Sequence, residues 1–230
     1  MVVPCFNEQD RIAATIETLS CPSSLPSAVT EILFVDDGST DRTPELLDAA
    51  ASLPRMTVLR LPRNSGKGAA VRAGLAASTG AVVVFMDADL ATDLDDLPAL
   101  VAALDEVPVA IGSRALPGSA VFDAPTSRGV MGRTFNRLVR AITGLPYRDT
   151  QCGFKAFRRD AAEELLGTCQ TDGFGFDVEI LLRADASGHR VHEVPVRWTA
   201  VPGSRINPVR DSIGMVVQVV RARRSVSRRT

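Results

Sequence analysis

The sequence predicts a single α/β domain built around a mostly parallel sheet, and three observations carry that prediction. Short apolar runs alternate with helix-like stretches along the first half of the 230 residues. The composition, 45% hydrophobic and 23% charged, suffices for a sizeable core and disfavours disorder. No internal repeat or long linker divides the chain, so one domain is the simplest organisation. Strands that alternate with helices form right-handed β-α-β units, in which the strands are parallel.

The expected strands are short and rich in β-favouring residues. The clearest is 80–86, which contains a Val-Val-Val-Phe run. The run 31–35 is largely apolar, as is typical of a strand covered on both faces. Segment 191–198 alternates in polarity, and its Pro195 favours an edge position. A second edge strand is expected at 153–157. The expected strands are 1–3, 31–35, 56–61, 80–86, 107–111, 153–157 and 191–198.

The expected helices carry apolar residues at helical spacing or begin at capping residues. The stretch 7–19 places its apolar positions near one face. Thr40 or Asp41 can cap a helix that runs to about residue 52. The stretch 124–142 is expected to be a helix broken near Gly129. The expected helices are 7–19, 41–52, 68–78, 93–104, 124–142, 160–166, 176–186 and 208–224.

Three polar clusters follow three of the expected strands. In an open parallel sheet, ligands bind beyond the carboxyl ends of the strands. Clusters at three such ends therefore predict a ligand site more strongly than any one of them does. They are Pro4 to Glu8, Asp36 to Ser39, and Asp87 to Asp89.

The Asp87-Ala88-Asp89 cluster pairs two carboxylates at the end of a buried strand. Two such groups repel when both are ionised, and a divalent cation resolves that conflict. Mg²⁺ or Mn²⁺ prefers oxygen ligands and bridges carboxylates to substrate phosphates. A bare D-x-D is common, and the alternative is a solvated turn before a helix. Its place after a buried strand favours the metal site.

The Asp36-Asp37-Gly38 cluster has two interpretations that the sequence leaves equally open. An acidic residue at the end of an early strand can accept hydrogen bonds from ribose hydroxyls or a base N–H. Alternatively, the segment is a turn followed by a helix cap, which Asp and Ser supply well. Gly38 permits the tight turn in both cases.

The stretch Asn64-Ser65-Gly66-Lys67-Gly68 resembles a phosphate loop but does not match one. The P-loop pattern requires Ser or Thr after the lysine and a glycine at position 61, and neither is present. We therefore exclude a P-loop NTPase. Gly66 and Gly68 still allow backbone N–H groups and Lys67 to approach a diphosphate near a helix start.

Composition narrows the partners and the location. The net charge of −1 carries no sign of nucleic-acid binding. Four cysteines and two histidines lack zinc-site spacing, which predicts reduced and mostly buried thiols. No apolar run approaches the roughly 20 residues of a spanning helix, and no signal peptide is evident. We expect a cytoplasmic protein that is peripheral on the cytoplasmic face of a membrane. A first strand at 1–3 would be unusually short, so we expect that a few residues precede it.

The arginine-rich tail offers a way to reach a membrane. Apolar residues between 213 and 220 are flanked by arginines, a pattern that suits a helix lying on anionic lipid. The alternative is a helix packed on the domain and followed by a basic end. The arginines are Arg210, Arg221, Arg223, Arg224, Arg228 and Arg229.

Together these segments resemble family 2 glycosyltransferases of the GT-A fold, and most closely the dolichyl-phosphate glucose synthase and dolichyl-phosphate mannose synthase branch. The resemblance spans about residues 2–205. The segments that carry it are Val3-Pro-Cys-Phe-Asn-Glu8, Asp36-Asp-Gly-Ser39, Asn64-Ser-Gly-Lys-Gly68, Asp87-Ala-Asp-Leu90, Gly112-Ser-Arg114, Ser127-Arg128, Asn136, Asp149-Thr-Gln-Cys-Gly-Phe-Lys155 and Phe176-Asp-Val-Glu179.

The resemblance implies a GT-A domain over 1–205 with a Rossmann-like sheet. Residues 1–112 would form its nucleotide-sugar half and 113–205 its acceptor half, followed by a basic amphipathic tail at 206–230. The implied reaction is inverting transfer of a hexose, with glucose favoured over mannose, to dolichyl or polyprenyl phosphate. The donor would be UDP-glucose or GDP-mannose, and the cofactor Mg²⁺ or Mn²⁺. Alternatives are a polysaccharide or small phosphorylated acceptor, or a nucleotide-sugar-binding module without turnover.

On the donor side, the resemblance implies that Asp36, Pro4 and Glu8 bind the nucleoside. Asp87 and Asp89 would hold the metal and, through it, the diphosphate. Relatives can supply a third ligand two residues after the second aspartate. That position is Ala91 here, so water or another group would replace it.

On the acceptor side, Arg114 and Arg128 would grip the phosphate, because guanidinium groups bind phosphate oxygens in pairs. Lys155 would join the same anion site, with Arg133 as a weaker candidate. Asp149 is the usual candidate base. A phosphate monoester is largely ionised near neutral pH, however, so Asp149 has the alternative role of orienting Arg128, Lys155 or the acceptor. Asp177 and Glu179 belong either to the site or to a helix cap.

Overall fold

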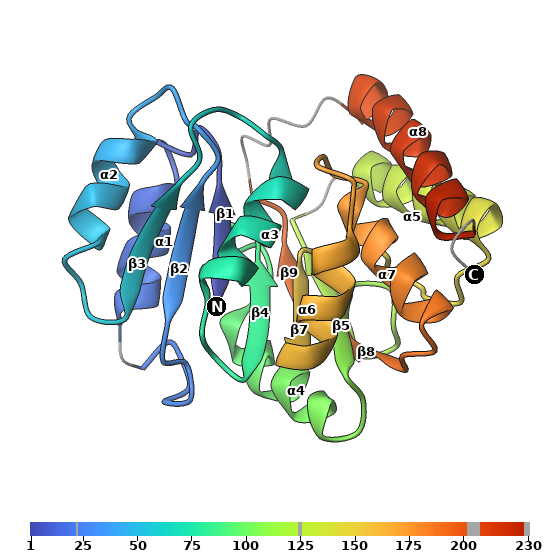
Figure 1. Ribbon diagram of the computed structural model, residues 1–230, viewed down its shortest axis with the longest axis horizontal. Coiled ribbons are helices and arrows are strands. Elements are labelled where there is room, and N and C mark those ends of the chain that lie inside the picture. The colour runs from blue at the N-terminus through green and yellow to red at the C-terminus, as the bar shows by residue number, and fades with distance from the viewer. Residues whose placement is uncertain (22, 124–125, 202–207, 228–230) are drawn as a thin grey trace.

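The computed structural model describes residues 1–21, 23–123, 126–201 and 208–227, without the side chains at 126–131 and 208–213. Within them lies a seven-stranded sheet in the order β3-β2-β1-β4-β7-β5-β8, with a separate two-stranded pair, β6 and β9 (Figure 1). The strands are β1 (Val2–Cys5), β2 (Ile32–Asp36), β3 (Met56–Arg60), β4 (Val82–Met86), β5 (Val109–Ser113), β6 (Ala120–Phe122), β7 (Phe154–Arg158), β8 (Val191–Pro195) and β9 (Arg197–Thr199).

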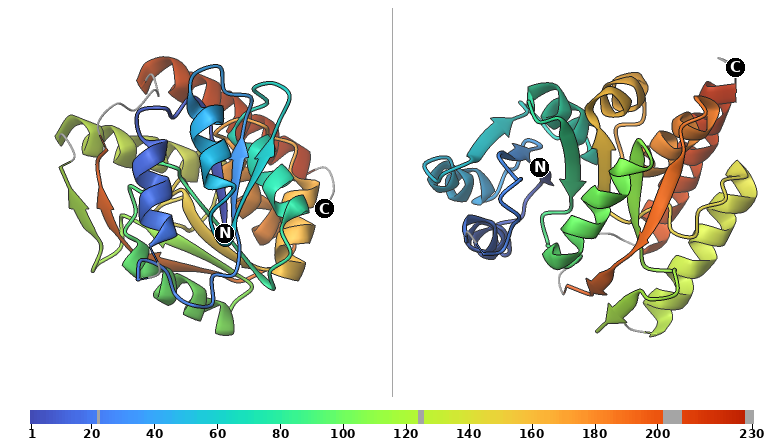
Figure 2. Two further views of the ribbon diagram at one scale, coloured as in Figure 1. Left: turned by 90° about the vertical axis from the view of Figure 1, so that its left-hand side faces the viewer. Right: turned by 90° about the horizontal axis from the view of Figure 1, so that it is seen from below.

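Helices cover both faces of the sheet (Figure 2). Apolar residues of α1, α2 and α4 pack on one face, and those of α3, α6 and α7 pack on the other. The helices are α1 (Ile12–Ser20), α2 (Thr43–Ala50), α3 (Lys67–Ala77), α4 (Leu97–Ala102) between the short 3₁₀ helices η1 (Leu94–Asp96) and η2 (Ala103–Asp105), α5 (Thr126–Thr143), α6 (Arg159–Thr168), α7 (Phe176–Ala186) and α8 (Pro208–Ser227). The predicted mostly parallel α/β fold is confirmed.

Six strands of the large sheet run in one direction, and β7 runs against its neighbours. It pairs antiparallel with β4 and with β5, so those two strands are parallel to each other. The carboxyl ends of β1, β2, β4 and β5 therefore meet at one edge of the sheet. That edge is where an open α/β sheet places its ligands.

The prediction of an edge strand at 153–157 is wrong. The strand β7 lies inside the sheet, and residues 154–157 are all buried. Gly153 and Lys155 gave the segment the polarity of an edge. In the fold the Lys155 ammonium contacts Asp177, so a buried lysine is compensated there.

The first helix begins later than predicted. The region 7–11 is a turn, and α1 starts at Ile12. Asn7 has φ of 54°, in the left-handed region that does not continue a right-handed helix. Its side-chain Oδ1 accepts hydrogen bonds from the backbone N–H groups of Thr40 and Asp41, which ties the turn to the segment after β2.

Three further features differ from the prediction. Helix α5 runs without a break at Gly129, because a single glycine costs a helix only about 1 kcal/mol. The segment 191–198 divides into β8 and β9 after Pro195, which has no N–H to extend the ladder. The predicted edge position of Pro195 is confirmed, since β8 ends the sheet. The three-residue strand β6 was not predicted.

The amphipathic helix at the tail is confirmed, but much of its apolar side faces the protein. Helix α8 packs on α7 and lies beside α5 (Figure 1). Val219, Ala222 and Val226 belong to the core on that face. Val217 is exposed, as are Arg221, Arg223 and Arg224. The predicted Arg210 and Ile213 side chains, and Arg228 and Arg229, lie outside the described residues.

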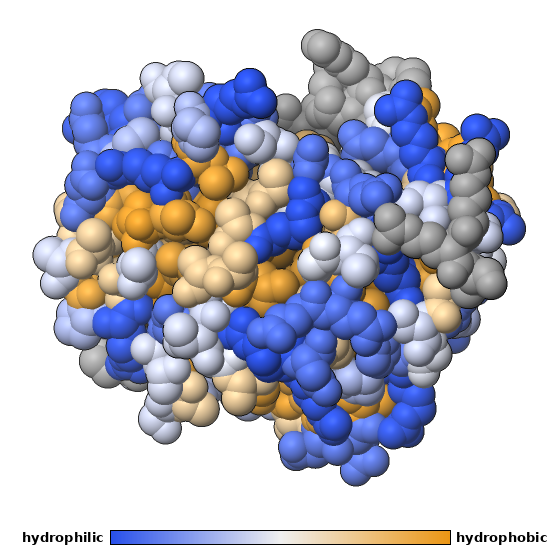
Figure 3. Space-filling view, in the orientation of Figure 1, coloured by the Kyte–Doolittle hydropathy of each residue, from blue (hydrophilic) through white to orange (hydrophobic). Residues whose placement is uncertain are grey.

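In the described part of the chain, no helix is long and apolar enough to cross a membrane. The space-filling view shows apolar side chains at the surface over β2 and β3 (Figure 3). Leu59 and Leu61 are only partly buried there.

Candidate functional site

The three predicted polar clusters do meet at one edge of the sheet. They follow β1, β2 and β4, which are parallel neighbours in the order β2-β1-β4. Direct bonds join the first two clusters, because the Asn7 N–H donates to Ser39 Oγ at 2.9 Å and the Glu8 N–H donates to Thr43 Oγ1 at 2.7 Å. The Glu8 carboxylate pairs with Arg11 at 2.6 Å. Pro4 is half-buried within β1, beside Val35 of β2.

Asp36 and Asp37 have different surroundings although they are adjacent. Asp36 is buried and its Oδ1 accepts the Ser39 N–H at 2.9 Å. Its other oxygen lies 3.8 Å from Arg60 Nε. Both oxygens of Asp37 accept backbone N–H groups at 2.7 Å, from Ser65 and from Gly66. Asp37 therefore fastens the glycine-rich loop, and burial raises the pKa of its carboxyl.

Gly38 and the two glycines beside Lys67 allow close packing around this loop. Gly38 and Gly66 have φ of 69° and 98°, and a Cβ on either would lie within 2.4 Å of backbone atoms. A Cβ on Gly68 would meet the carbonyl oxygen of Thr171 at the same distance. The N–H of Gly66 goes to Asp37 and that of Gly68 to the Asp172 carbonyl at 2.7 Å. Both expected phosphate-facing N–H groups thus have acceptors within the protein, and Asn64 is exposed beside them.

Lys67 is the group that this loop presents to the site. It is the first residue of α3, and its Nζ lies 2.6 Å from Asp87 Oδ1 and 3.5 Å from Asp177 Oδ2. The ammonium also lies 5.6 Å from the centre of the Phe176 ring. Burial acts to lower the pKa of Lys67, but the charges of Asp177 and Asp87 outweigh it and raise the pKa. Lys67 is therefore a cation fixed beside the first carboxylate of the D-x-D pair.

A second lysine continues this chain of charges into the core. Lys155 has no exposed surface, and its Nζ lies 2.5 Å from Asp177 Oδ1 and 2.6 Å from the Cys152 carbonyl oxygen. The order Lys155–Asp177–Lys67–Asp87 alternates positive and negative groups. The expectation that Lys155 joins the acceptor anion site is wrong in this structure, because Lys155 is enclosed and Asp177 takes its charge.

The carboxylates of Asp87 and Asp89 fit a site for a divalent cation. Asp87 is partly open, with 43% of its side chain exposed. Asp89 Oδ1 accepts the Ala91 N–H at 3.1 Å. Burial and the neighbouring Asp87 charge raise the pKa of Asp89, which is the strain that a bound cation relieves. Within the described residues, no third His, Cys, Asp or Glu joins the pair. Mg²⁺ commonly takes one or two protein carboxylates with substrate phosphates and water, so two suffice.

The backbone around the pair is held from two sides. The Ala88 carbonyl accepts the Thr15 hydroxyl of α1 at 2.6 Å. Leu90 has φ of 49°, an uncommon conformation for a leucine. On the other side, a Cβ on Gly153 would lie 1.9 Å from Asp87 Oδ2. A side chain at position 153 would therefore require the Asp87 carboxylate to move.

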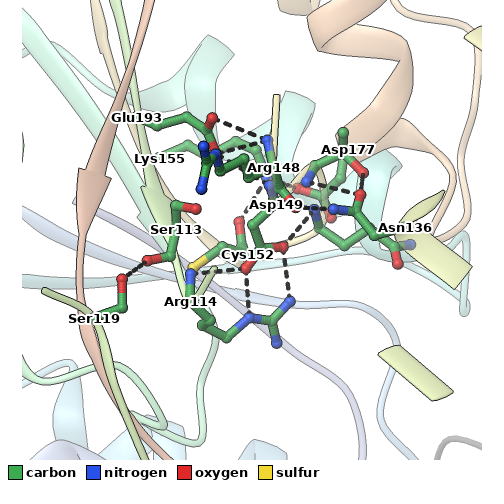
Figure 4. A network of polar contacts seen from close by, with 12 residues as sticks. Ser113, Arg114, Ser119, Asn136, Arg148, Asp149, Cys152, Lys155, Asp177 and Glu193 are labelled. Atoms are coloured by element: carbon green, nitrogen blue, oxygen red, sulfur yellow. Dashed lines mark hydrogen bonds and ion pairs between the residues drawn. The ribbon is translucent and has the colours of Figure 1, made fainter. Parts of the chain in front are cut away.

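Arg114 and Asp149 form a close ion pair at the end of β5 (Figure 4). Arg114 follows β5, and its Nε and Nη2 donate to the two oxygens of Asp149 at 2.7 and 2.9 Å. The Arg114 N–H adds a third bond at 3.0 Å, and the guanidinium lies 5.5 Å from the Trp198 ring. Burial acts to raise the pKa of Asp149, but Arg114 outweighs it and holds that pKa below its ordinary value. A buried carboxylate held in this way suits positioning better than proton abstraction.

The loop that carries Asp149 is anchored by two neighbours. Glu193 of β8 accepts the N–H groups of Arg148 and Asp149 at 3.0 Å. Asn136 of α5 accepts the Thr150 hydroxyl at 3.0 Å and donates to the Arg148 carbonyl. The Arg128 side chain lies outside the described residues, although its backbone is in the first turn of α5.

Asp177 belongs to the site, whereas Glu179 does not contact the residues described above. Glu179 binds Arg183 and accepts the N–H groups of Gln170 and Thr171, which holds the loop before α7. The sequence left both residues open between a site role and a cap. The sequence did contain a signal for the role of Asp177. The apolar strand that contains Lys155 buries this lysine, and a buried lysine requires a carboxylate nearby.

The structure thus brings a carboxylate pair, a fixed lysine and an arginine together at one edge of an open sheet. The chain belongs to glycosyl transferase family 2, whose model matches residues 1–166.

Several relatives extend the match beyond the family model. The glycosyltransferase AglD of Haloferax volcanii is 38% identical over 228 residues, which cover 96% of this chain and 36% of that protein. The chain thus spans about a third of that relative. The dolichyl-phosphate beta-glucosyltransferase of Saccharomyces cerevisiae is 32% identical, over 96% of this chain and 72% of the relative.

Solved structures support the fold. Glucosyl-3-phosphoglycerate synthase from Mycobacterium tuberculosis, in complex with Mn²⁺, UDP-glucose and phosphoglyceric acid, aligns with a TM-score of 0.70 and 22% identity. The alignment covers 98% of this chain and 78% of that one. The same enzyme has been crystallised with Mg²⁺ and UDP. The GT-A architecture expected from the sequence is confirmed.

Proposed function

We propose that this chain transfers a hexose, with glucose favoured, from a nucleotide-diphosphate sugar to dolichyl or polyprenyl phosphate, with inversion. One observation carries the proposal. Arg114, fixed by Asp149 at the end of β5, lies at the same sheet edge as Asp87 and Asp89 at the end of β4. That edge thus offers a cation-binding pair for a donor diphosphate and a guanidinium for an anionic acceptor. The dolichyl-phosphate beta-glucosyltransferases among the relatives support glucose as the sugar.

On the donor side, Asp36 with Pro4 and Glu8 would bind the nucleoside of UDP-glucose or GDP-mannose. Asp87 and Asp89 would hold Mg²⁺ or Mn²⁺, which supplies positive charge to a departing diphosphate. Lys67, whose Nζ lies 2.6 Å from Asp87 Oδ1, would add a second positive charge. These groups bind and orient the donor while its leaving group gains charge.

On the acceptor side, Arg114 and Arg128 would hold the lipid phosphate in line with the sugar. A phosphate monoester has a second pKa near about 6, so it is largely ionised at neutral pH and needs no strong base. Asp149 accordingly orients Arg114 rather than removing a proton. Placing two bound reactants in line accounts for a large part of such a rate enhancement.

The proposal also gives the chain a cellular location and gives its segments separate roles. Residues 1–112 would serve the donor and 113–205 the acceptor. The segment 206–230 would support peripheral binding at the cytoplasmic face of a membrane. The exposed Val217, Arg221 and Arg224 of α8 favour this contact with anionic lipid.

The test is transfer of radiolabelled sugar from UDP-glucose, and in parallel from GDP-mannose, to polyprenyl phosphate with Mn²⁺. We expect lipid-soluble label from UDP-glucose that requires the metal. Asp89→Asn should lower the rate by about 10²-fold or more, because charge stabilisation of the leaving group is lost.

A parallel reaction offers 3-phosphoglycerate as the acceptor. Label on that small acceptor, with none on the lipid, would move the assignment to a soluble phosphorylated acceptor. Nucleotide binding without transfer to either acceptor would leave a binding module.

A further inference from the structure

A cavity next to the Arg114–Asp149 pair is lined mainly by arginines. It lies between α5 and the loops after β5 and α5, and its volume is about 260 Å³. The lining residues are Ala115, Arg133, Asn136, Arg137, Arg140 and Arg148.

The helical repeat explains why these side chains converge. Positions 133, 136, 137 and 140 are spaced by three, four and seven residues, so they share one face of α5. Arg148 comes from the loop that returns along this helix. Asn136 joins the two segments, because it donates to the Arg148 carbonyl and accepts the Thr150 hydroxyl (Figure 4). The cavity is thus built on a fastened helix–loop junction.

Among the residues whose side chains the structure describes, no carboxylate pairs with the arginines around the cavity. Arg114, Arg183 and Arg197 each bind a carboxylate, as charged side chains at such density usually do. Within the described residues, none of the four cavity arginines has a carboxylate partner. The nearby Glu193 accepts backbone N–H groups, and the amide of Asn136 is bonded at both ends.

Four like charges on one helix face and its adjoining loop repel one another. The cost falls when an anion binds among them, and guanidinium groups match phosphate oxygens in geometry. Among the described residues, the lining contains no aromatic ring on which a base could stack and only one small apolar residue, Ala115. The chemistry of the cavity therefore selects a compact, multiply charged anion.

We propose that this cavity is a phosphate-binding site, separate from the Arg114–Asp149 pair, for a phosphomonoester or diphosphate group. The group comes either from a lipid headgroup or from a soluble phosphate. The inference rests on the cavity and its charges and does not require the proposed glycosyl transfer.

The test uses the full chain and two double variants of equal charge. Arg137→Gln with Arg140→Gln removes two charges from the cavity. Arg42→Gln with Arg55→Gln removes two exposed charges from the other half of the protein. Titration calorimetry with inorganic phosphate and pyrophosphate forms one arm. Co-sedimentation with phosphatidylcholine vesicles, with and without about 30% phosphatidic acid, forms the other. Thermal unfolding confirms that both variants remain folded.

We expect saturable binding that weakens about tenfold or more in the cavity variant and is unchanged in the control, since each lost charge-assisted bond is worth roughly a tenfold change in affinity. Loss in the calorimetric arm identifies a soluble phosphate, and loss only with phosphatidic acid identifies a lipid headgroup. Absence of saturable binding in both arms, or equal weakening in both variants, would overturn the proposal.

Discussion

The proposed donor and acceptor sides of the site hold their cations in different ways. Lys67 lies between Asp87 and Asp177, and Asp177 in turn holds the fully buried Lys155. Arg114 binds one carboxylate, Asp149, and about a third of its side chain is exposed beside Trp198. Lys155 and Asp177 are therefore part of the core, whereas Arg114 stands at its margin. Changes on the donor side should affect stability and activity together, and changes on the acceptor side should affect mainly the acceptor.

The largest expected effect tests the buried end of the donor network. Lys155→Met leaves Asp177 without its nearest partner in the core, and breaking a buried pair costs about 3–5 kcal/mol. The free energy of unfolding in urea should fall by that amount. The double change Lys155→Met with Asp177→Asn should recover part of the loss. The exposed pair Arg42–Glu45 supplies the control, where Arg42→Ala should cost less than about 1 kcal/mol. A loss below 1 kcal/mol for Lys155→Met would show that the network is not structural.

The next effect separates Lys67 from the rest of its loop. Lys67→Ala removes the cation beside Asp87, so transfer should slow by about 100-fold. Arg63→Ala, an exposed change on the same loop, should leave the rate within about twofold. Rates of labelled product formation at saturating donor check both. Equal losses in the two variants would mean that the loop, and not the Lys67 charge, is what matters.

A smaller effect is expected for the acceptor side. Asp149→Asn removes the charge that orients Arg114, so KM for the acceptor should rise by about tenfold while the affinity for the donor is unchanged. Because the pKa of Asp149 lies below its ordinary value, its titration should leave no acidic limb in the rate between about pH 5 and pH 8. An acidic limb in that range that disappears in Asp149→Asn would restore its assignment as a base.

The smallest effect is the contribution of the Arg114–Asp149 pair to stability. The folded pKa of Asp149 is lowered, so the ionised carboxylate adds stability that is complete above the unfolded value of about 4 and is lost as the pH falls through the folded value. Because about a third of the Arg114 side chain is exposed and water screens the pair, the difference in unfolding free energy between wild type and Asp149→Asn should be about 1 kcal/mol or less at pH 7. Unfolding curves measured between pH 2 and pH 7 should show that this difference in free energy becomes smaller below pH 4. A constant difference across that range would contradict the ion pair.

The residues of the donor side were largely predictable from sequence, because the order of short segments along the chain determines where they lie. Three polar clusters followed three apolar runs, and parallel strands bring such ends together. The acceptor side depends on a long-range arrangement that local patterns do not specify. Strand β7 enters between β4 and β5, and this places Gly153 against Asp87 and Lys155 against Asp177. Nothing local to residues 153–158 marks an interior antiparallel strand, so Lys155 was assigned to the wrong environment.

The same limit applies to the glycine-rich loop. Its composition suggested backbone N–H groups open to a diphosphate. Asp37 and the Asp172 carbonyl occupy two of those groups, and both lie far away in sequence. Asp37 was predicted to contact a ligand for the same reason. The sequence does not show that the fold buries this carboxylate and bonds it to the loop.

The most direct test of the two-sided site is UDP binding by titration calorimetry with and without Mn²⁺, in wild type, Asp89→Asn and Asp149→Asn. The account predicts Mn²⁺-dependent binding that weakens about tenfold or more in Asp89→Asn and is unchanged in Asp149→Asn. Full Mn²⁺-dependent affinity in Asp89→Asn, or its loss in Asp149→Asn, would contradict a donor site built on β4 and independent of Arg114.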